Sequence, residues 1–134
     1  MCEYEVKEDL IKYKAKDSST GARNLLRLQR ALEYINAFLK ELPAMANEDK
    51  CCPVSQNAYK GTLMKFHPWV VQKAALVAMH MLPTREGLIQ KICQNDEEKY
   101  KRALETLPKT VEAMDKVYDM TNEIYAKHGL LELP

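Results

Sequence analysis

Three arginines with helical spacing are the residues of this sequence best suited to bind a ligand. Arg23, Arg27 and Arg30 stand at positions i, i+4 and i+7, and Tyr34 follows at i+11. At about 100° per residue, these side chains share a narrow sector of a helix. Guanidinium groups bind phosphate through charge-assisted hydrogen bonds, and an anion would offset the repulsion between like charges. The pattern indicates an anion site, and a solvated face balanced by nearby glutamates is the alternative.

His67 is the second candidate for a binding residue. It stands at the start of a predicted apolar helix, and small or apolar residues continue the same face: Val71, Ala74 and Ala78. An imidazole above such a surface can hydrogen-bond the polar group of a molecule whose apolar tail lies along the helix. The alternative is a capping histidine, or one whose partners lie within the core. No serine or cysteine is paired with His67 in a recognisable nucleophile pattern.

Trp69 is the only tryptophan, and its ring suits either a protein core or a membrane interface, where amphipathic aromatic rings are favoured. No glycine-rich phosphate loop, H-E-x-x-H helix or paired-carboxylate signature is present in the sequence. His80 is predicted to face away from His67, and His128 lies near the end of the chain. The sequence therefore gives no support to an enzyme, a metal site or a cofactor.

Composition narrows the classes of partner. The 134 residues fit one domain, and 46% of them are hydrophobic, which is enough for a core. Lysine and arginine number 20 against 19 acidic residues, so the chain lacks the basic excess of nucleic-acid-binding proteins. The longest unbroken apolar tract, residues 74–79, is too short to span a bilayer. We expect a soluble protein whose membrane contact is peripheral.

The four cysteines do not form a recognisable site. They occupy positions 2, 51, 52 and 93, without a C-x-x-C pair or zinc-ligand spacing. Reduced thiols in a cytosolic protein are the simplest interpretation. The first ten residues contain several acidic side chains and no apolar run, so no signal peptide is predicted.

The arginine face must be positioned by a long helix. Apolar residues alternate there in steps of three and four, which places them on one stripe roughly opposite the arginines. The stripe consists of Leu25, Leu28, Leu32, Ile35, Leu39 and Leu42. Pro43 follows and ends the predicted helix.

The rest of the chain also reads as helical, without the alternation typical of strands. Pro83 ends one helix, Thr84 can cap the next, and Gly129 is a C-terminal cap. The predicted helices cover residues 3–15, 22–42, 54–66, 68–82, 84–93 and 95–127, the last with a bend at Pro108. We therefore predict an all-α fold of about six helices in one domain, residues 1–134.

Several segments resemble one known family in order and spacing. Residues 23–32 are similar to an R-x-x-x-R-L-x-R-A-L helix, and residues 59–72 to a segment built around Y-H-P-W-V-V, in which Phe66 replaces the tyrosine. Residues 82–86 resemble an L-P-T-R-E turn, and residues 125–134 a characteristic C-terminal tail. These motifs resemble the glycolipid transfer protein family, in particular its branch that carries ceramide 1-phosphate.

The resemblance implies a two-layer, all-helical sandwich that encloses sphingolipid chains in an apolar pocket, here including Val71, Ala74 and Ala78. Arg23 and Arg27 match the arginines that hold the lipid phosphate, and Lys14 and Arg30 fall at further basic positions of that site. His67 matches the histidine that hydrogen-bonds the lipid amide. Trp69 lies in the region that touches the membrane. The implied function is transfer of a phosphorylated sphingolipid between membranes by a monomeric cytoplasmic carrier.

The likeness also shows a difference. Family domains begin earlier, and the preceding helices carry an aspartate and a lysine of the head-group site that have no counterpart in this sequence. Residues 3–6 resemble an internal part of the family. A truncated form would leave apolar helix faces exposed. A lipid sensor or interaction module without net transfer is therefore the alternative function.

Overall fold

The computed structural model describes residues 1–12 and 20–133, and within these ranges the regular elements are all helical. The predicted all-α class is confirmed. The α-helices are α1 (Cys2–Lys7), α2 (Gly21–Glu41), α3 (Cys51–Gly61), α4 (Trp69–Ala78), α5 (Arg85–Ile92) and α6 (Glu97–Lys127). Short 3₁₀ helices join them: η1 (Leu10–Lys12), η2 (Leu42–Ala44), η3 (Leu63–Phe66) and η4 (Met79–Met81).

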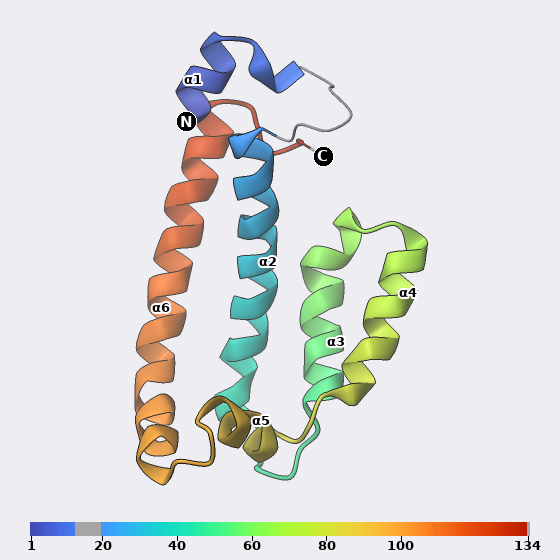
Figure 1. The fold of residues 1–134 in the computed structure, drawn as a ribbon, viewed down its shortest axis with the longest axis vertical. Coiled ribbons are helices and arrows are strands. Elements are labelled where there is room, and N and C mark those ends of the chain that lie inside the picture. The colour runs from blue at the N-terminus through green and yellow to red at the C-terminus, as the bar shows by residue number, and fades with distance from the viewer. Residues whose placement is uncertain (13–19, 134) are drawn as a thin grey trace.

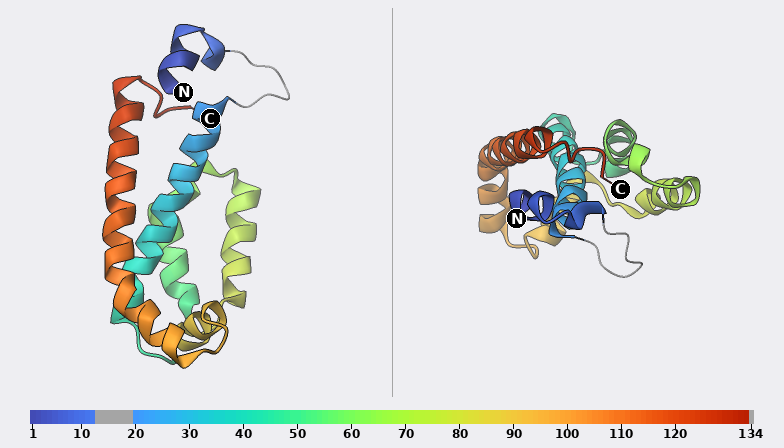
Figure 2. Two further views of the ribbon diagram at one scale, coloured as in Figure 1. Left: turned by 60° about the vertical axis from the view of Figure 1, so that its left-hand side comes forward. Right: turned by 90° about the horizontal axis from the view of Figure 1, so that it is seen from above.

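Helix α2 is the centre of the arrangement (Figure 1). It packs against α6 on one side and α3 on the other, and α4 stands beyond α3. Seen from above, these four helices stand in a row, with α1 across the upper end and α5 across the lower end (Figure 2). No described helix is both long enough and apolar enough to cross a membrane.

The start of α2 is fixed by side chains that accept its first amide hydrogens. The Thr20 hydroxyl accepts from the Arg23 amide at 3.4 Å, and the Glu5 carboxylate accepts from the amides of Gly21 and Ala22 at 2.8 and 3.0 Å. A negative charge at a helix N-terminus is stabilising because the free amides and the helix dipole both favour it. Glu5 thereby attaches α1 to α2. The predicted helix 22–42 is confirmed to within one residue at each end.

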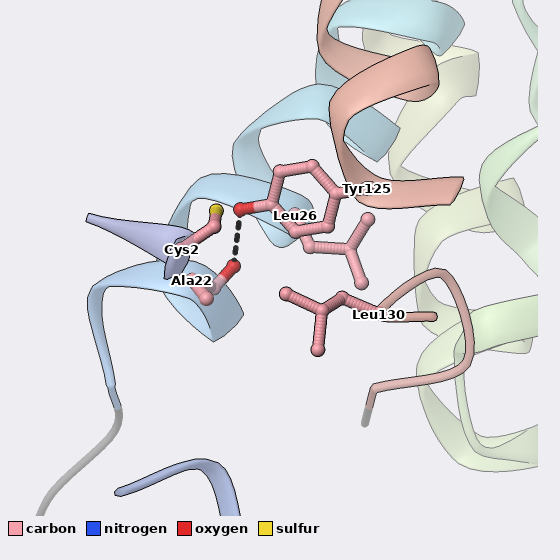
Figure 3. Packing of buried hydrophobic residues seen from close by; sticks show 5 residues of the cluster. All are labelled: Cys2, Ala22, Leu26, Tyr125 and Leu130. Carbon is pink, nitrogen blue, oxygen red and sulfur yellow. Dashed lines mark hydrogen bonds between the residues drawn. The ribbon is translucent and has the colours of Figure 1, made fainter. Parts of the chain in front are cut away.

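The buried core joins segments that are far apart in the sequence. The Tyr125 hydroxyl donates a 2.6 Å hydrogen bond to the Ala22 carbonyl, and burial raises the pKa of Tyr125 to about 12. Gly129, with φ of 65°, ends α6 as predicted and allows the Leu130 amide to bond back to the Tyr125 carbonyl. The cluster consists of Cys2, Ala22, Leu26, Tyr125 and Leu130 (Figure 3).

Polar side chains connect α2 to α6 along the rest of their length. Gln29 donates to the Tyr118 carbonyl at 3.4 Å. Asn36 and Lys40 both donate to the same carboxylate oxygen of Asp115, at 2.6 and 2.7 Å. These hydrogen bonds lower the pKa of Asp115, the bond from Lys40 most strongly.

The apolar stripe of α2 faces neither neighbouring helix along most of its length. Leu28 is 67% exposed and Ile35 is 45% exposed, whereas Leu42 at the lower end is buried. The α6 contacts come from the polar face of Gln29 and Asn36, and the α3 contacts from the face of Tyr34. The stripe of α2 is thus open at Leu28 and Ile35 and covered at its lower end.

Three of the predicted helices have different bounds in the structure. The helix predicted over 3–15 ends at Lys7, because Asp9 adopts a left-handed conformation with φ of 53°. The helix predicted over 54–66 begins at Cys51, since Pro53 falls in the first turn, where an amide hydrogen is not needed. It ends at Gly61, and the separate 3₁₀ helix η3 follows. The helix predicted over 68–82 tightens into a 3₁₀ turn after Ala78.

The last helices agree better with the prediction. The Thr84 hydroxyl accepts from the Gly87 amide and caps α5 as expected. Helix α6 is continuous through Pro108, and its orange lower end curves towards α5 (Figure 2). All four cysteines are free and buried, although Cys51 and Cys52 are adjacent in sequence.

Candidate functional site

A cavity of about 330 Å³ opens between α2 and η3. It combines guanidinium groups, an imidazole and apolar surface in one small volume. Its lining consists of Arg27, Arg30, Ala31, Leu63, Phe66 and His67. The structure therefore brings together two of the predicted arginines and the predicted histidine, although they come from different elements.

The cationic part of the cavity comes from neighbouring turns of α2. Arg27 is exposed, whereas Arg30 is half-buried and lies with its guanidinium carbon 3.8 Å from the centroid of the Phe66 ring. Burial lowers the pKa of Arg30, the charge of Arg27 lowers it further, and Glu132 acts in the opposite direction. Two positive charges this close favour an anion between them.

Arg30 also has a second set of contacts. Its Nη2 donates to the carbonyls of Leu131 and Leu133 at 3.0 and 2.8 Å. Arg30 therefore fastens the C-terminal segment to α2 and at the same time forms part of the cavity wall. The resemblance to the family placed Arg30 at a basic position of the phosphate site without deciding between a ligand and a structural role.

Arg23 lies one turn before Arg27, and it is not among the residues that line this cavity. Its Nη2 donates to the Ile11 carbonyl at 2.7 Å, so its guanidinium group is directed towards η1. Its buried Nε finds no hydrogen-bond partner among the described residues. Lys14, the remaining predicted basic residue, lies outside the described residues.

His67 stands between η3 and α4 in an extended conformation. Its Nδ1 lies 2.6 Å from the hydroxyl oxygen of Tyr59 on α3. Burial raises the pKa of Tyr59, and the neighbouring Tyr34 adds to this effect, so the phenol stays protonated at neutral pH. His67 thus has an internal partner at one ring nitrogen and lines the cavity as well.

The apolar residues predicted after His67 lie on the open side of α4. Val71, Ala74 and Ala78 are exposed, and no residue of α4 is buried. Trp69 is 68% exposed, with the Lys73 amino nitrogen 5.9 Å from its ring centroid. Trp69 is therefore not a core residue in this chain, and its predicted membrane role stays a prediction.

Two features of the site were missed by the sequence analysis. Tyr59 on α3 contacts His67, which follows η3, and no periodic pattern links the two positions. A second cavity of about 300 Å³ lies between α2, α6 and the C-terminal segment, and Arg30 and Phe66 line both cavities. Gln29, which lines this second cavity, is buried and has a side-chain oxygen without a partner in the described structure. No local pattern in the sequence indicated this position of Gln29, because its contact with Tyr118 joins residues 89 positions apart.

A search against protein families connects this geometry to known proteins. The model of the family described as glycolipid transfer protein matches residues 1–94. The chain belongs to the glycolipid transfer protein family. The ceramide-1-phosphate transfer protein of Xenopus laevis is 37% identical over 136 aligned residues, which cover the whole of this chain and 62% of the relative.

Solved structures of the family agree with the fold. The crystal structure of the mouse ceramide-1-phosphate transfer protein without ligand matches 98% of this chain with a TM-score of 0.85 at 32% identity. The human protein in complex with 2:0 ceramide 1-phosphate matches all of it with a TM-score of 0.81 at 30% identity. The predicted helical fold of the glycolipid transfer protein family is thereby confirmed. The chain spans less than two thirds of the length of these relatives, 62–64%.

Proposed function

We propose that this chain binds a phosphorylated sphingolipid of the ceramide 1-phosphate type and carries it between membranes. The observation that carries the proposal is the cavity in which Arg27, Arg30 and His67 meet apolar side chains. Relatives of this chain are named for transfer of ceramide 1-phosphate, and the human relative is seen with that lipid bound. The proposed ligand therefore has a phosphate, an amide and apolar chains.

Head-group preference follows from charge. Arg27 and Arg30 form charge-assisted hydrogen bonds with a phosphate, each worth roughly 1.5–3 kcal/mol. A neutral sugar would remove water from these guanidinium groups without replacing the lost interactions. The site therefore favours an anionic head group over an uncharged one.

The apolar chains explain why a carrier is useful. Each methylene group exposed to water costs about 0.8 kcal/mol, so a chain of about sixteen costs on the order of 13 kcal/mol. A protein that covers the chain removes most of this barrier to exchange between membranes. The exposed apolar residues of α4 and the stripe of α2 are the surfaces that this chain offers for the purpose.

Membrane contact and cellular location belong to the same proposal. The exposed Trp69 at the start of α4 suits a transient, peripheral contact with a bilayer. We propose a monomeric cytoplasmic protein that associates briefly with intracellular membranes. Binding and release account for this role without a chemical step, so no catalytic function is proposed.

A lipid sensor without net transfer is the second candidate function. The chain spans 62% of the Xenopus relative, and the stripe of α2 is open, as shown by the exposure of Leu28 and Ile35. An incompletely covered lipid would leave the membrane less easily. Binding without transfer is the outcome expected when the protein covers the lipid only in part.

Two vesicle measurements separate the candidates. Transfer of a fluorescent ceramide 1-phosphate from donor to acceptor vesicles measures carriage, and sedimentation with vesicles containing the same lipid measures binding alone. We expect Arg27→Ala to reduce either activity at least tenfold, because it removes a phosphate ligand. Arg27 is exposed, so its replacement does not disturb the core. Arg23→Ala should do the same if its guanidinium group reaches the phosphate.

The matched control is Arg102→Ala, which removes an exposed arginine from α6. It should leave both activities unchanged. Wild-type activity in the Arg23→Ala, Arg27→Ala double variant would refute the head-group assignment. Binding that depends on Arg27 without measurable transfer would favour the sensor.

A further inference from the structure

Tyr59 and His67 form a contact that the proposed lipid site does not by itself explain. Tyr59 is 2% exposed, and its hydroxyl oxygen lies 2.6 Å from His67 Nδ1. The Tyr34 ring meets the Tyr59 ring edge-on, with 6.1 Å between centroids, and the Tyr34 hydroxyl is 2.7 Å from the buried Ser55 hydroxyl. The phenol is therefore held in one place by packing before any ligand arrives.

In the hydrogen bond between Tyr59 and His67, the tyrosine hydroxyl is the donor. Burial raises the pKa of Tyr59, so its oxygen keeps the proton and is able to donate it in a hydrogen bond. An imidazole nitrogen that accepts this bond is the unprotonated one, which leaves the ring proton on Nε2. The phenol thus assigns the tautomer of His67.

The backbone of His67 is fixed independently of its ring. The Gln72 side-chain amide donates to the carbonyls of His67 and Met64, at 2.9 and 3.0 Å. The His67 amide in turn donates to the Met64 carbonyl at 3.1 Å. With the main chain and Nδ1 both held, the direction of the remaining ring nitrogen is determined.

We propose that Tyr59 is a positioning residue that holds His67 as its Nε2–H tautomer, so that the histidine presents a hydrogen-bond donor to a carbonyl oxygen of the ligand. The identity of the ligand rests on the proposed function, whereas the contact between Tyr59 and His67 does not. In the other tautomer, Nε2 would be an acceptor and would repel a carbonyl oxygen. Tyr59 therefore selects for phosphate-bearing lipids that carry an acyl carbonyl beside the head group.

The tautomer is tested first, without lipid. Nitrogen-15 NMR of the imidazole rings distinguishes a protonated from an unprotonated ring nitrogen, and the spectrum of His67→Gln identifies the His67 signals. We expect the wild type at neutral pH to show Nδ1 unprotonated and Nε2 protonated, and Tyr59→Phe to show a mixture of tautomers. An Nδ1–H tautomer in the wild type would overturn the proposal, even if Tyr59→Phe does not fold.

The second test compares two phosphate-bearing lipids, of which one has an acyl carbonyl and the other has none. Binding is measured to vesicles containing either ceramide 1-phosphate or a dialkyl ether phosphatidic acid, which has the phosphate and chains but no carbonyl. Tyr59→Phe should weaken binding of ceramide 1-phosphate about two- to tenfold, the worth of one neutral hydrogen bond, and leave the ether lipid unchanged. Equal loss for both lipids would mean a purely structural role and would refute positioning.

Ser55→Ala is the matched control, because it removes a hydroxyl from the same buried cluster without touching His67. It should alter neither the tautomer nor the preference for the carbonyl lipid. A wild type that binds neither lipid would refute the proposed function, and the NMR result would still decide the role of Tyr59. The two failures are therefore distinguishable.

Discussion

The guanidinium carbon of Arg30 lies 3.8 Å from the centroid of the Phe66 ring, while its Nη2 donates to the carbonyls of Leu131 and Leu133. Arg30 thus joins η3 and the C-terminal segment through one side chain. Arg27, one turn earlier, is exposed and faces the same cavity. Arg27 and Arg30, which share one face of α2, therefore have different structural roles.

Replacement of Arg30 should destabilise the protein more than replacement of Arg102, an exposed arginine of α6. Arg30→Ala removes two hydrogen bonds from a charged donor and a cation–π contact, and we expect a loss of about 2–3 kcal/mol in the free energy of unfolding. Arg102→Ala should change it by less than about 0.5 kcal/mol, as is usual for surface positions. Urea unfolding measures both. An Arg30→Ala variant of wild-type stability would show that the side chain serves the ligand only.

Trp69→Ala should weaken attachment to membranes without unfolding the chain, because the ring is 68% exposed. Loss of this aromatic surface is expected to weaken binding to vesicles that contain no ceramide 1-phosphate on the order of tenfold, about 1.4 kcal/mol. Sedimentation with vesicles checks the change. Met120→Ala, which removes an equally exposed apolar side chain from α6, is the control. An equal effect of both variants would argue against a specific role for Trp69.

Stability in acid should depend on Asp115. The hydrogen bonds from Lys40 and Asn36 lower its pKa in the folded state, so its contribution is complete above the ordinary aspartate value of about 3.9. It is lost as the pH falls through the lowered value. Asp115→Asn should therefore reduce the melting temperature at pH 7, and the difference from the wild type should shrink below about pH 4. Glu105→Gln, at an exposed position, should show no such trend. A difference that stays constant down to pH 2.5 would contradict the assignment.

Stability in alkali should depend on Tyr125. Because its folded pKa is about 12 and the ordinary tyrosine value is about 10, stability is complete below pH 10 and is lost as the pH rises towards 12. Tyr125→Phe should be about 1 kcal/mol less stable at neutral pH, since the bond to the Ala22 carbonyl is lost. Its melting temperature should fall less than that of the wild type between pH 10 and 12. Tyr4→Phe, which alters an exposed ring, should follow the wild type.

Local signals in the sequence located several helix ends correctly. Pro43, Thr84 and Gly129 act through their own backbone or hydroxyl group, so their effect does not depend on distant residues. The helix predicted from residue 54 begins at Cys51 instead, because a proline in the first turn, here Pro53, has no amide bond to lose. Asp9 ends α1 by a left-handed conformation that aspartate adopts only in some contexts.

The same local signals do not predict contacts between residues that are far apart in the sequence. The arginine spacing predicted a shared face, but the carbonyls that engage Arg30 belong to residues about one hundred positions later in the chain. The leucine stripe predicted an apolar surface, yet periodicity does not tell whether the covering partner lies within the chain. The resemblance to the family identified His67 as a ligand residue, whereas its bond to Tyr59 required coordinates.

The hydrogen bond from Tyr125 to Ala22 spans 103 positions, as does the one from Arg30 to Leu133. Closing such a long loop carries a large entropic cost before any contact repays it, and it slows folding. During synthesis on the ribosome, Leu26 stays exposed until Tyr125 and Leu130, which pack against it, have emerged. This order of assembly makes the nascent chain a natural client for chaperones that shield apolar segments.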